Sequence, residues 1–369
     1  MALIHDEIRQ VLKRWVVERG VAPGASAYVA RFDGAAWRSA EGAAGLHSGA
    51  GSAEVAPQTI YDLASLTKPV VACTLARRIR AGELRWESPL GSLLPEATGT
   101  VSEAVPLRLF ASHRAGLLAH VRLRDTGVAP AGWLSLCAGA RRPECQTELP
   151  DEGFAPLYSD LGYILMGALL ERRAGAALER LVQLEVSEPH ALELHSAQGW
   201  AERLGPERFL ASVAPTELVS ERGGLLWGVV HDDNAWDCRG AGLAGHAGLF
   251  GTAAAVGGFA QAVLDALAGR SPEWLSPAEA GVLVEPRPGG SLRTGFDGKA
   301  TQGSSAGARF GARAFGHLGF TGTSLWCEPD ASVVVVLLTN RVYPSRENVR
   351  IRDVRPDVHG ELFGLAAGL

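Results

Sequence analysis

Apolar positions recur at helical spacing in several separate stretches of this chain. Residues 3–20 show this period and stop at Gly20, which predicts an amphipathic helix near the N-terminus. The two long segments at about 119–156 and 185–243 are rich in Gly and Pro, and segments of this length line a site or carry small elements of their own. The helical period predicts further helices over residues 69–80, 161–173, 176–184 and 253–267.

Short apolar runs bounded by turn residues predict strands near both ends of the chain. Residues 24–31 and 36–40 flank Phe32-Asp33-Gly34, whose Asp-Gly pair predicts a hairpin. Near the C-terminus, residues 324–328 and 332–338 predict two further strands. The run 332–338 is apolar on both faces, which predicts a central strand covered by helices on both sides of its sheet.

The order of these elements predicts an α+β fold with an antiparallel sheet, flanked by helices, and an inserted helical block. A final helix is expected from about residue 349. We expect residues 1–80 and 285–369 to form an α/β subdomain around the sheet, and residues 81–284 to form a mainly helical subdomain. If both ends of the chain share one sheet, the active site lies in the cleft between these parts.

Composition excludes several classes of partner. The net charge is −5, so neither nucleic acid nor an anionic membrane is expected as a partner, and the oligomeric state stays open. No stretch is apolar enough to span a bilayer, and acidic residues near the N-terminus do not fit a signal peptide, which predicts a cytoplasmic protein. The five cysteines lack metal or disulfide spacing, so we expect structural thiols, no metal and no cofactor.

Ser65-Leu66-Thr67-Lys68 is the strongest chemical motif in the chain. A spacing of three places both side chains on one helix face, and Pro69 is tolerated only in a first helical turn. Ser65 is therefore expected at a helix N-terminus, whose positive end favours an attacking oxygen or an oxyanion. We expect the same field, together with burial, to lower the pKa of Lys68, so that a neutral amine accepts the proton of Ser65.

The use of lysine in this chain gives limited support to that role. Only three lysines, Lys13, Lys68 and Lys299, stand among the 35 basic residues. A lysine kept in such a background is able to lose its proton, which arginine cannot do. The alternative is a helix cap followed by a surface lysine.

Two further motifs carry polar groups suited to the same chemistry. Tyr158-Ser159-Asp160 precedes an apolar helix, and a phenolate near Lys68 would act as a proton shuttle. Phe315 to Thr323 is rich in glycine, which lets a substrate or an oxyanion approach closely, and the backbone N–H groups of Phe320 and Ser65 would form an oxyanion hole. Each motif also has a structural interpretation. The first could be a helix cap beside a packed tyrosine, and the second a glycine-rich strand edge beside a solvated histidine.

In this order, Ser-x-x-Lys, Tyr-Ser-Asp and His-x-Gly resemble the three motifs of the serine β-lactamase and penicillin-binding protein superfamily. The closer resemblance is to its class C β-lactamase-related branch, which also holds carboxylesterases and D-amino-acid peptidases. It implies a β-lactamase/transpeptidase-like fold and a serine hydrolase that acts on an ester, amide or β-lactam. Segments that resemble this branch cover nearly the whole chain, at residues 60–69, 82–95, 109–117, 230–235, 245–252 and 316–341.

The resemblance also implies roles for individual residues. Ser65 is acylated, Lys68 and Tyr158 handle its proton and later the deacylating water, and the N–H groups of Ser65 and Phe320 bind the oxyanion. His317 takes the place of the lysine that contacts the substrate in relatives, and the substrate is a small acyl compound. Asp160, Gly319 and His246 are further candidates to face it, and His246 in its glycine-rich turn has a structural role as an equal alternative.

Two residues depart from the pattern of penicillin-active relatives. Asp160 stands where these often carry Asn, which adds negative charge near Lys68 and favours its protonated form. His317 replaces a lysine used against a substrate carboxylate, and an ordinary histidine is mostly neutral at pH 7. Both changes favour an esterase or amidase that acts on neutral acyl substrates.

Several alternatives remain open at this point. Gly303-Ser304-Ser305-Ala306-Gly307 matches the nucleophile elbow of α/β-hydrolases but lacks a predicted strand before it and a helix after it. Gly240 to Gly245 matches a dinucleotide-binding pattern without a βαβ unit, and His231-Asp232-Asp233 lacks the second cluster that a metal site needs. A β-lactamase-like fold without turnover, serving as a binding or regulatory module, is the alternative to an enzyme.

Overall fold

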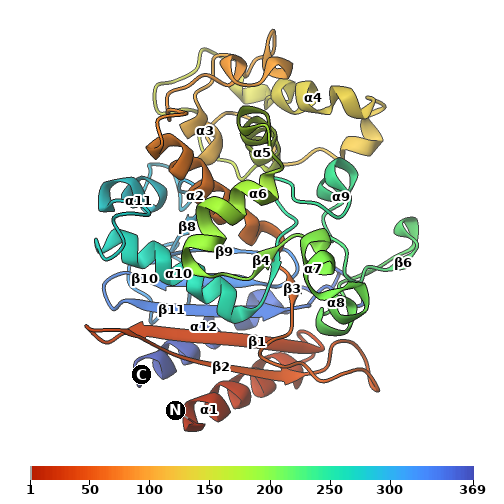
Figure 1. Ribbon diagram of the computed structural model, residues 1–369, viewed down its shortest axis with the longest axis vertical. Helices are drawn as coiled ribbons and strands as arrows, with labels where there is room; N and C mark the ends of the chain where they lie inside the picture. Colours follow the sequence, from red (N-terminus) through yellow and green to blue (C-terminus); the bar gives the residue numbers. More distant parts are fainter. Residues whose placement is uncertain (1) are drawn as a thin grey trace.

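Six antiparallel strands form the main sheet of the computed structural model, which describes residues 2–369 (Figure 1). In their order across the sheet they are β2 (Trp37–Gly45), β1 (Gly24–Phe32), β11 (Val333–Thr339), β10 (Ser324–Glu328), β9 (Phe315–Leu318) and β8 (Asp297–Gly298). Strand β1 pairs with β11 in a register that runs from Ala25 opposite Thr339 to Arg31 opposite Val333. Because both ends of the chain share one sheet, the segment between them is an insertion.

The predicted N-terminal hairpin and the central position of the last strand are confirmed. The Asp33 carboxylate closes the hairpin turn by accepting hydrogen bonds from the N–H groups of Ala35 and Ala36, each at 2.8 Å. Strand β2 runs on beyond the predicted end at residue 40 to Gly45, because its pairing with β1 continues to Gly24. Strand β11 lies between β1 and β10 and is buried along its whole length.

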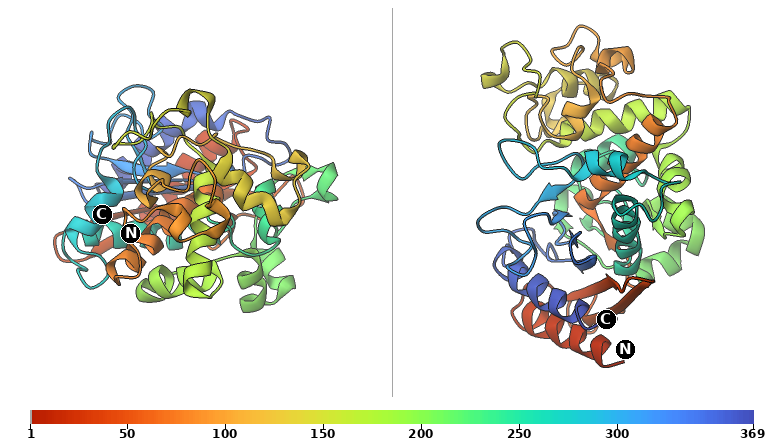
Figure 2. Two further views of the ribbon diagram at one scale, coloured as in Figure 1. Left: turned by 90° about the horizontal axis from the view of Figure 1, so that it is seen from above. Right: turned by 90° about the vertical axis from the view of Figure 1, so that its left-hand side faces the viewer.

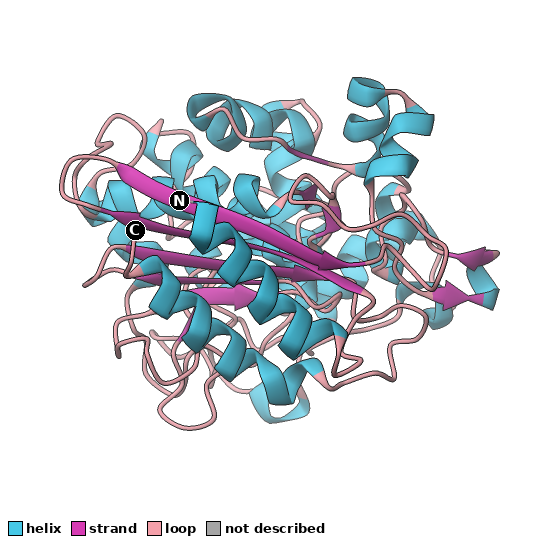
Figure 3. Cartoon of the chain, turned by 90° about the horizontal axis from the view of Figure 1, so that it is seen from below, coloured by secondary structure: helices cyan, strands magenta, loops and turns pink. Residues whose placement is uncertain are grey.

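Helices cover both faces of the sheet, as the apolar sequence of β11 requires. Odd-numbered side chains from Val333 to Leu337 share a core with α1 (Ala2–Leu12) and α12 (Ile351–Ala366), which lie side by side in Figure 3. Even-numbered side chains from Val334 to Leu338 share a second core with α10 (Ala253–Leu267) and the helical block. Because successive side chains of a strand point to opposite faces of the sheet, one apolar run contributes to two separate cores.

The helical block lies at the end of the molecule away from the two termini (Figure 2). Helix α2 (Thr67–Arg80) begins two residues before the predicted start at 69 and is almost wholly buried, so it connects the sheet to this block. Helix α5 (Asp160–Ala174) is the long helix of the block. The other helices are α3 (Leu107–Ala111), α4 (Trp133–Gly139), α6 (Leu178–Val182) and α11 (Pro277–Val284).

Helix α10 departs from the predicted division of the chain. Its residues were assigned to the mainly helical subdomain, but α10 packs against β1, β10 and β11. Gly257 makes this contact close, since a Cβ at that position would overlap the ring of Tyr28 on β1. An apolar helical period alone does not show which neighbour a helix covers.

The two long segments carry small elements, as expected. The segment at about 119–156 contributes α4, and the segment at 185–243 contributes α7 (Ala197–Leu204), α8 (Pro206–Ser212), α9 (Asp233–Arg239) and a projecting hairpin of β5 (Leu218–Val219) and β6 (Gly224–Leu225). A small sheet joins β3 (Tyr61–Asp62), β7 (Phe250–Gly251) and β4 (Leu194–His195). Pairing of β3 with β7 brings the residues before Ser65 next to the segment that follows Gly245.

Replacement of Leu337 tests the buried centre of the sheet. We expect Leu337→Ala to lower the free energy of unfolding by about 2–5 kcal/mol, because the side chain is 0% exposed and leaves a cavity. Leu3 is 78% exposed, so Leu3→Ala is the matched control and should change stability by less than about 0.5 kcal/mol. Urea unfolding measures both, and equal small losses would contradict the central position of β11.

Candidate active site

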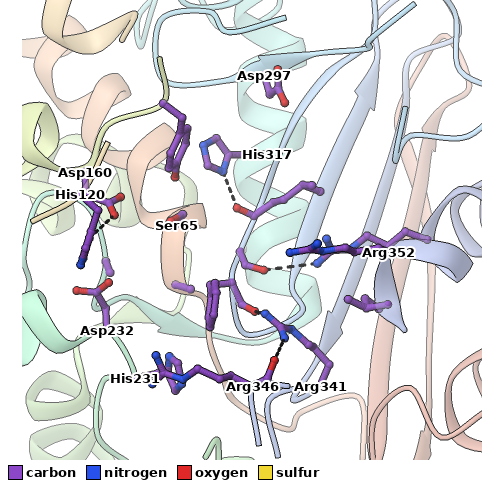
Figure 4. Close-up of a pocket in the computed structure, with 18 of the residues that line it drawn as sticks. Ser65, His120, Asp160, His231, Asp232, Asp297, His317, Arg341, Arg346 and Arg352 are labelled. Atoms are coloured by element: carbon purple, nitrogen blue, oxygen red, sulfur yellow. Dashed lines mark hydrogen bonds and ion pairs between the residues drawn. The ribbon is translucent and has the colours of Figure 1, made fainter. Parts of the chain in front are cut away.

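Ser65 lies on a tight turn between β3 and α2. The turn is a short 3₁₀ helix, Ala64–Leu66, and Ala64 has a φ of +48°, a conformation that a residue with a side chain rarely adopts. The buried Asp62 carboxylate fixes the turn by accepting hydrogen bonds from Ala64 N at 2.8 Å and His231 N at 2.6 Å. Ser65 therefore stands at the start of a buried helix and lines a cleft of about 580 Å³ (Figure 4).

The Lys68 side chain is fully buried beneath Ser65. Its Nζ lies 3.0 Å from Ser65 Oγ, 2.7 Å from Asp160 Oδ1 and 3.1 Å from the His246 carbonyl oxygen. Burial alone would lower the pKa of Lys68, but the negative charge of Asp160 and the contact with Tyr158 outweigh it and raise the pKa above its usual value. The prediction of a lowered pKa is therefore wrong, because Asp160 makes an ion pair with the amine.

Asp160 is the first residue of α5 and also contacts His120. The His120 Nδ1 atom lies 3.3 Å from Asp160 Oδ2, and the His120 side chain is 47% exposed in the cleft. Burial would raise the pKa of Asp160, but the positive charge of Lys68 and the hydrogen bond with His120 hold it below its usual range. The hydrogen bond to Asp160 in turn raises the pKa of His120.

Tyr158 lies against Lys68 and is held by a buried histidine. Its ring stacks on the ring of His113 at a centroid distance of 4.7 Å, and Lys68 Nζ lies 4.8 Å from the Tyr158 ring centroid. His113 Nδ1 accepts a hydrogen bond from Ser159 N at 3.0 Å, which fixes the segment before α5. Burial raises the pKa of Tyr158, although the charge of Lys68 acts in the opposite direction.

His317 lines the cleft beside Tyr158 as a neutral imidazole. Burial, followed by the positive charge of Lys68, lowers the pKa of His317 to about 3. Its Nδ1 lies 2.9 Å from the Leu318 carbonyl oxygen, which only accepts, so Nδ1 carries the proton. The ring thus presents no positive charge to the cleft at pH 7.

Residues 319–323 form a turn that faces Ser65 across the cleft. The Thr321 hydroxyl donates to the Asp62 carbonyl at 2.7 Å, and the Thr323 hydroxyl donates to the Leu63 carbonyl at 3.0 Å. Gly319 is required at this close approach, since a Cβ there would overlap Thr323 Oγ1 and the Leu63 carbonyl. Among the hydrogen bonds of residues 2–369, none uses the N–H of Phe320.

The positions of the predicted site residues can now be compared. Those that line one cleft are Ser65, Tyr158, Asp160, His317, Gly319 and Phe320, with Lys68 buried directly behind Ser65. His246 is different: it is almost fully buried, its Nε2 lies 2.8 Å from Asp232 Oδ1, and only its carbonyl reaches the site. The expectation that His246 faces substrate is corrected accordingly.

Several groups of the cleft were not identified from the sequence. Asp232, which the sequence placed only in a substrate-side loop or on the surface, lines the cleft and caps α9 by accepting a hydrogen bond from Ala235 N. His113 and His120 have no local signal, because each becomes important only through contacts made in the folded chain. The far end of the cleft is basic and is lined by Arg341, Arg346, Arg352 and Arg355.

The weaker motifs do not form sites of their own. Ser305 lies outside the cleft, and its carbonyl accepts a hydrogen bond from the buried His359 at 2.6 Å. Gly240 follows the end of α9 and does not connect a strand to a helix. His231 Nε2 bonds Glu217 Oε2 at 2.7 Å, and no metal-binding group of three or more His, Cys, Asp or Glu occurs within residues 2–369.

Within residues 2–369, no helix is long and apolar enough to cross a membrane.

Comparison with known proteins agrees with the fold and the motifs. A family model described as Beta-lactamase matches residues 12–358. A putative D-alanyl-D-alanine carboxypeptidase of Escherichia coli K12 is 26% identical over 306 residues, which is 77% of this chain and 69% of that protein.

Two solved structures share the fold at low sequence identity. EstCE1, described as a hydrolase with promiscuous acyltransferase activity, superposes with a TM-score of 0.69 at 19% identity and covers 97% of this chain and 98% of its own. The D-amino acid amidase of Ochrobactrum anthropi SV3, solved with L-phenylalanine amide, gives a TM-score of 0.68 at 16% identity over 99% of each chain.

The fold and the motif-bearing cleft define a protein of the serine β-lactamase and penicillin-binding protein superfamily, as the motifs predicted. The chain belongs to the β-lactamase family. The expected β-lactamase/transpeptidase-like fold, with an antiparallel sheet flanked by helices, is confirmed.

Removing the charge of Asp160 tests the ion pair. In Asp160→Asn, burial is no longer opposed by a carboxylate, so the pKa of Lys68 should fall. We expect the pH midpoint for inactivation by a fluorophosphonate to move down by about one unit or more. Asp330→Asn is the control, since Asp330 pairs with Arg313 on the surface. An unchanged midpoint in Asp160→Asn would show that Asp160 does not set the ionisation of Lys68.

Proposed function

We propose that this chain is a serine hydrolase that forms an acyl-enzyme on Ser65, activated by Lys68 and Tyr158. One observation carries the proposal: a buried lysine lies with its Nζ 3.0 Å from the hydroxyl of a serine that opens onto a cleft. A nucleophile within hydrogen-bond distance of a second group, itself oriented by a third, is the arrangement that covalent catalysis needs. Here Asp160 and the His246 carbonyl orient Lys68.

The ion pair determines how the proton of Ser65 leaves. Lys68 as an ammonium cannot accept a proton, so the reacting form is the one in which Lys68 has released its proton to solvent while Asp160 stays ionised. Neutral Lys68 then takes the proton of Ser65 as Ser65 Oγ bonds to the acyl carbon, and the negative charge appears on the acyl oxygen. Tyr158 lies beside the same amine, so it would give its proton to the leaving group and receive one from Lys68, which is neutral again at the end of the step.

The backbone supports a site for the oxyanion. The N–H of Phe320 has no partner among the described residues, and the turn that carries it is bonded to the residues just before Ser65. We assign the oxyanion hole to the N–H groups of Ser65 and Phe320. Donors that are fixed before the reaction stabilise charge without reorganisation during it.

An ester or amide with a neutral group near His317 is the favoured substrate. His317 is uncharged at pH 7, because burial and Lys68 lower its pKa to about 3. It therefore offers no cation to a substrate carboxylate at this position. The fold shared with EstCE1 and with a D-amino acid amidase is consistent with such substrates.

A substrate with a free carboxylate is the second candidate. Arg352 is exposed in the cleft and makes no ion pair within the described residues, so its charge is available to an anion. The relative described as a putative D-alanyl-D-alanine carboxypeptidase is in line with this alternative.

Labelling of the nucleophile tests the proposal. We expect an activated ester or a fluorophosphonate to add one adduct, seen in the intact-protein mass, and Ser65→Ala to abolish it, because the hydroxyl that lies 3.0 Å from Lys68 Nζ and opens onto the cleft is then absent. Ser305→Ala is the matched control and should label normally. No adduct on the folded wild-type chain with either reagent or a chromogenic cephalosporin would favour a binding module without turnover.

A pair of p-nitrophenyl esters, one neutral and one with a carboxylate, separates the two substrate classes. A higher kcat/KM for the neutral ester supports the favoured class. A higher kcat/KM for the charged ester, lost in Arg352→Met, supports the second.

A further inference from the structure

Two buried arginines lie behind the turn at residues 319–323. Arg341 follows β11, and Arg355 lies on α12; both are at least nine-tenths buried and line the cleft. Neither makes an ion pair with a carboxylate within the described residues. Burial of a guanidinium without a carboxylate partner costs free energy, so the hydrogen bonds that offset this cost indicate the role of the side chain.

The hydrogen bonds of these arginines all go to main-chain carbonyls, three of them in the turn and two in residues 346–348. Arg341 donates from Nε at 2.9 Å and from a terminal nitrogen at 2.6 Å, both to the Phe320 carbonyl. Its other terminal nitrogen donates to the carbonyls of Arg346 and Asn348 at 2.8 and 3.0 Å. Arg355 donates to the Thr323 carbonyl at 3.0 Å and reaches the Gly319 carbonyl at 3.5 Å.

The Gly319 carbonyl belongs to the same peptide group as the N–H of Phe320. A cation on that carbonyl polarises the peptide and makes the N–H a stronger donor. The turn is thereby held from two sides, by Asp62 and Leu63 at its front and by Arg341 and Arg355 behind it.

The two arginines also make the rear of the turn positively charged. Burial, then the charges of Arg341 and Arg352, lowers the pKa of Arg355 to about 9, which leaves it charged at pH 7. The side chain of Arg355 keeps its Nε without a partner among residues 2–369. The protein thus tolerates an unfavourable charge directly behind the position where negative charge develops during acyl transfer.

We propose that Arg355, together with Arg341, is a positioning residue for the oxyanion hole: it orders the 319–323 turn and supplies positive potential behind the Phe320 N–H. The inference rests on the proposed acyl-enzyme chemistry at Ser65. It adds that the oxyanion hole depends on two side chains that do not touch the substrate.

Binding of phenylboronic acid, together with ester kinetics, tests this role. The boronate forms a tetrahedral anionic adduct on a serine, so its affinity reports oxyanion stabilisation. For Arg355→Met we expect a loss of about 10- to 100-fold in boronate affinity and in kcat, with KM for a neutral ester changed by less than about threefold. Arg355→Lys keeps the charge and should recover part of both losses.

Arg313→Met is the matched control, because Arg313 is exposed and pairs with Asp330 away from the cleft. It should leave boronate affinity unchanged. If Arg355→Met does not fold, Arg355→Lys and Arg341→Lys decide the question, since each retains charge but loses the planar fork. In both variants, the fold-loss in boronate affinity should then exceed the fold-increase in KM for the neutral ester.

Three results would overturn the proposal. Unchanged boronate affinity in the folded Arg355 variants would show that the turn does not depend on this arginine. A rise in KM as large as the fall in kcat would indicate a general structural role. A loss confined to a carboxylate-bearing ester would mean that Arg355 binds the substrate anion directly. Wild-type boronate binding that vanishes in Ser65→Ala would show at the same time that the proposed function stands.

Discussion

The buried ion pair between Lys68 and Asp160 is the constraint on which the site depends. Removal of an ammonium and a carboxylate from water costs several kcal/mol for each ion, so the pair persists only where geometry and further hydrogen bonds compensate. Lys68 on α2, Asp160 at the start of α5 and the His246 carbonyl before β7 meet at one nitrogen. The contacts of this one nitrogen therefore fix the positions of α2, the start of α5 and the segment at His246 relative to one another.

The same pair determines the charge around the nucleophile. Burial, followed by the charge of Lys68, lowers the pKa of the nearby His317 and keeps it neutral. Because Asp160 holds Lys68 as an ammonium, the lysine has to lose a proton before it can accept that of Ser65. Positive charge is instead placed on the opposite side of the cleft, where Arg341 and Arg355 bond the turn that carries Phe320. The site thus separates the proton path from the stabilisation of the oxyanion.

The sequence was most informative where a local rule applies. The Asp33-Gly34 turn, the doubly apolar run of β11 and the place of Pro69 in a first helical turn each follow from backbone chemistry, and all were predicted. The ionisation of Lys68 stayed open in the sequence, where burial at a helix start favoured a neutral amine and Asp160 favoured a protonated one. The balance of these opposed effects depends on a distance of 2.7 Å. The contacts of His120 and Arg355 join segments far apart in the chain, so no spacing in the sequence reveals them.

The ionisation state of Lys68 is the most direct test, and the composition makes it practical. The chain has three lysines, so a protein labelled with ¹⁵Nζ-lysine gives three signals, and Lys13→Arg and Lys299→Arg identify the third. We predict that Lys68 shows the chemical shift of an ammonium throughout pH 6 to 9 and that Asp160→Asn moves its titration to lower pH. A neutral amine at pH 7 in the wild-type protein would contradict the ion pair and the proton path built on it.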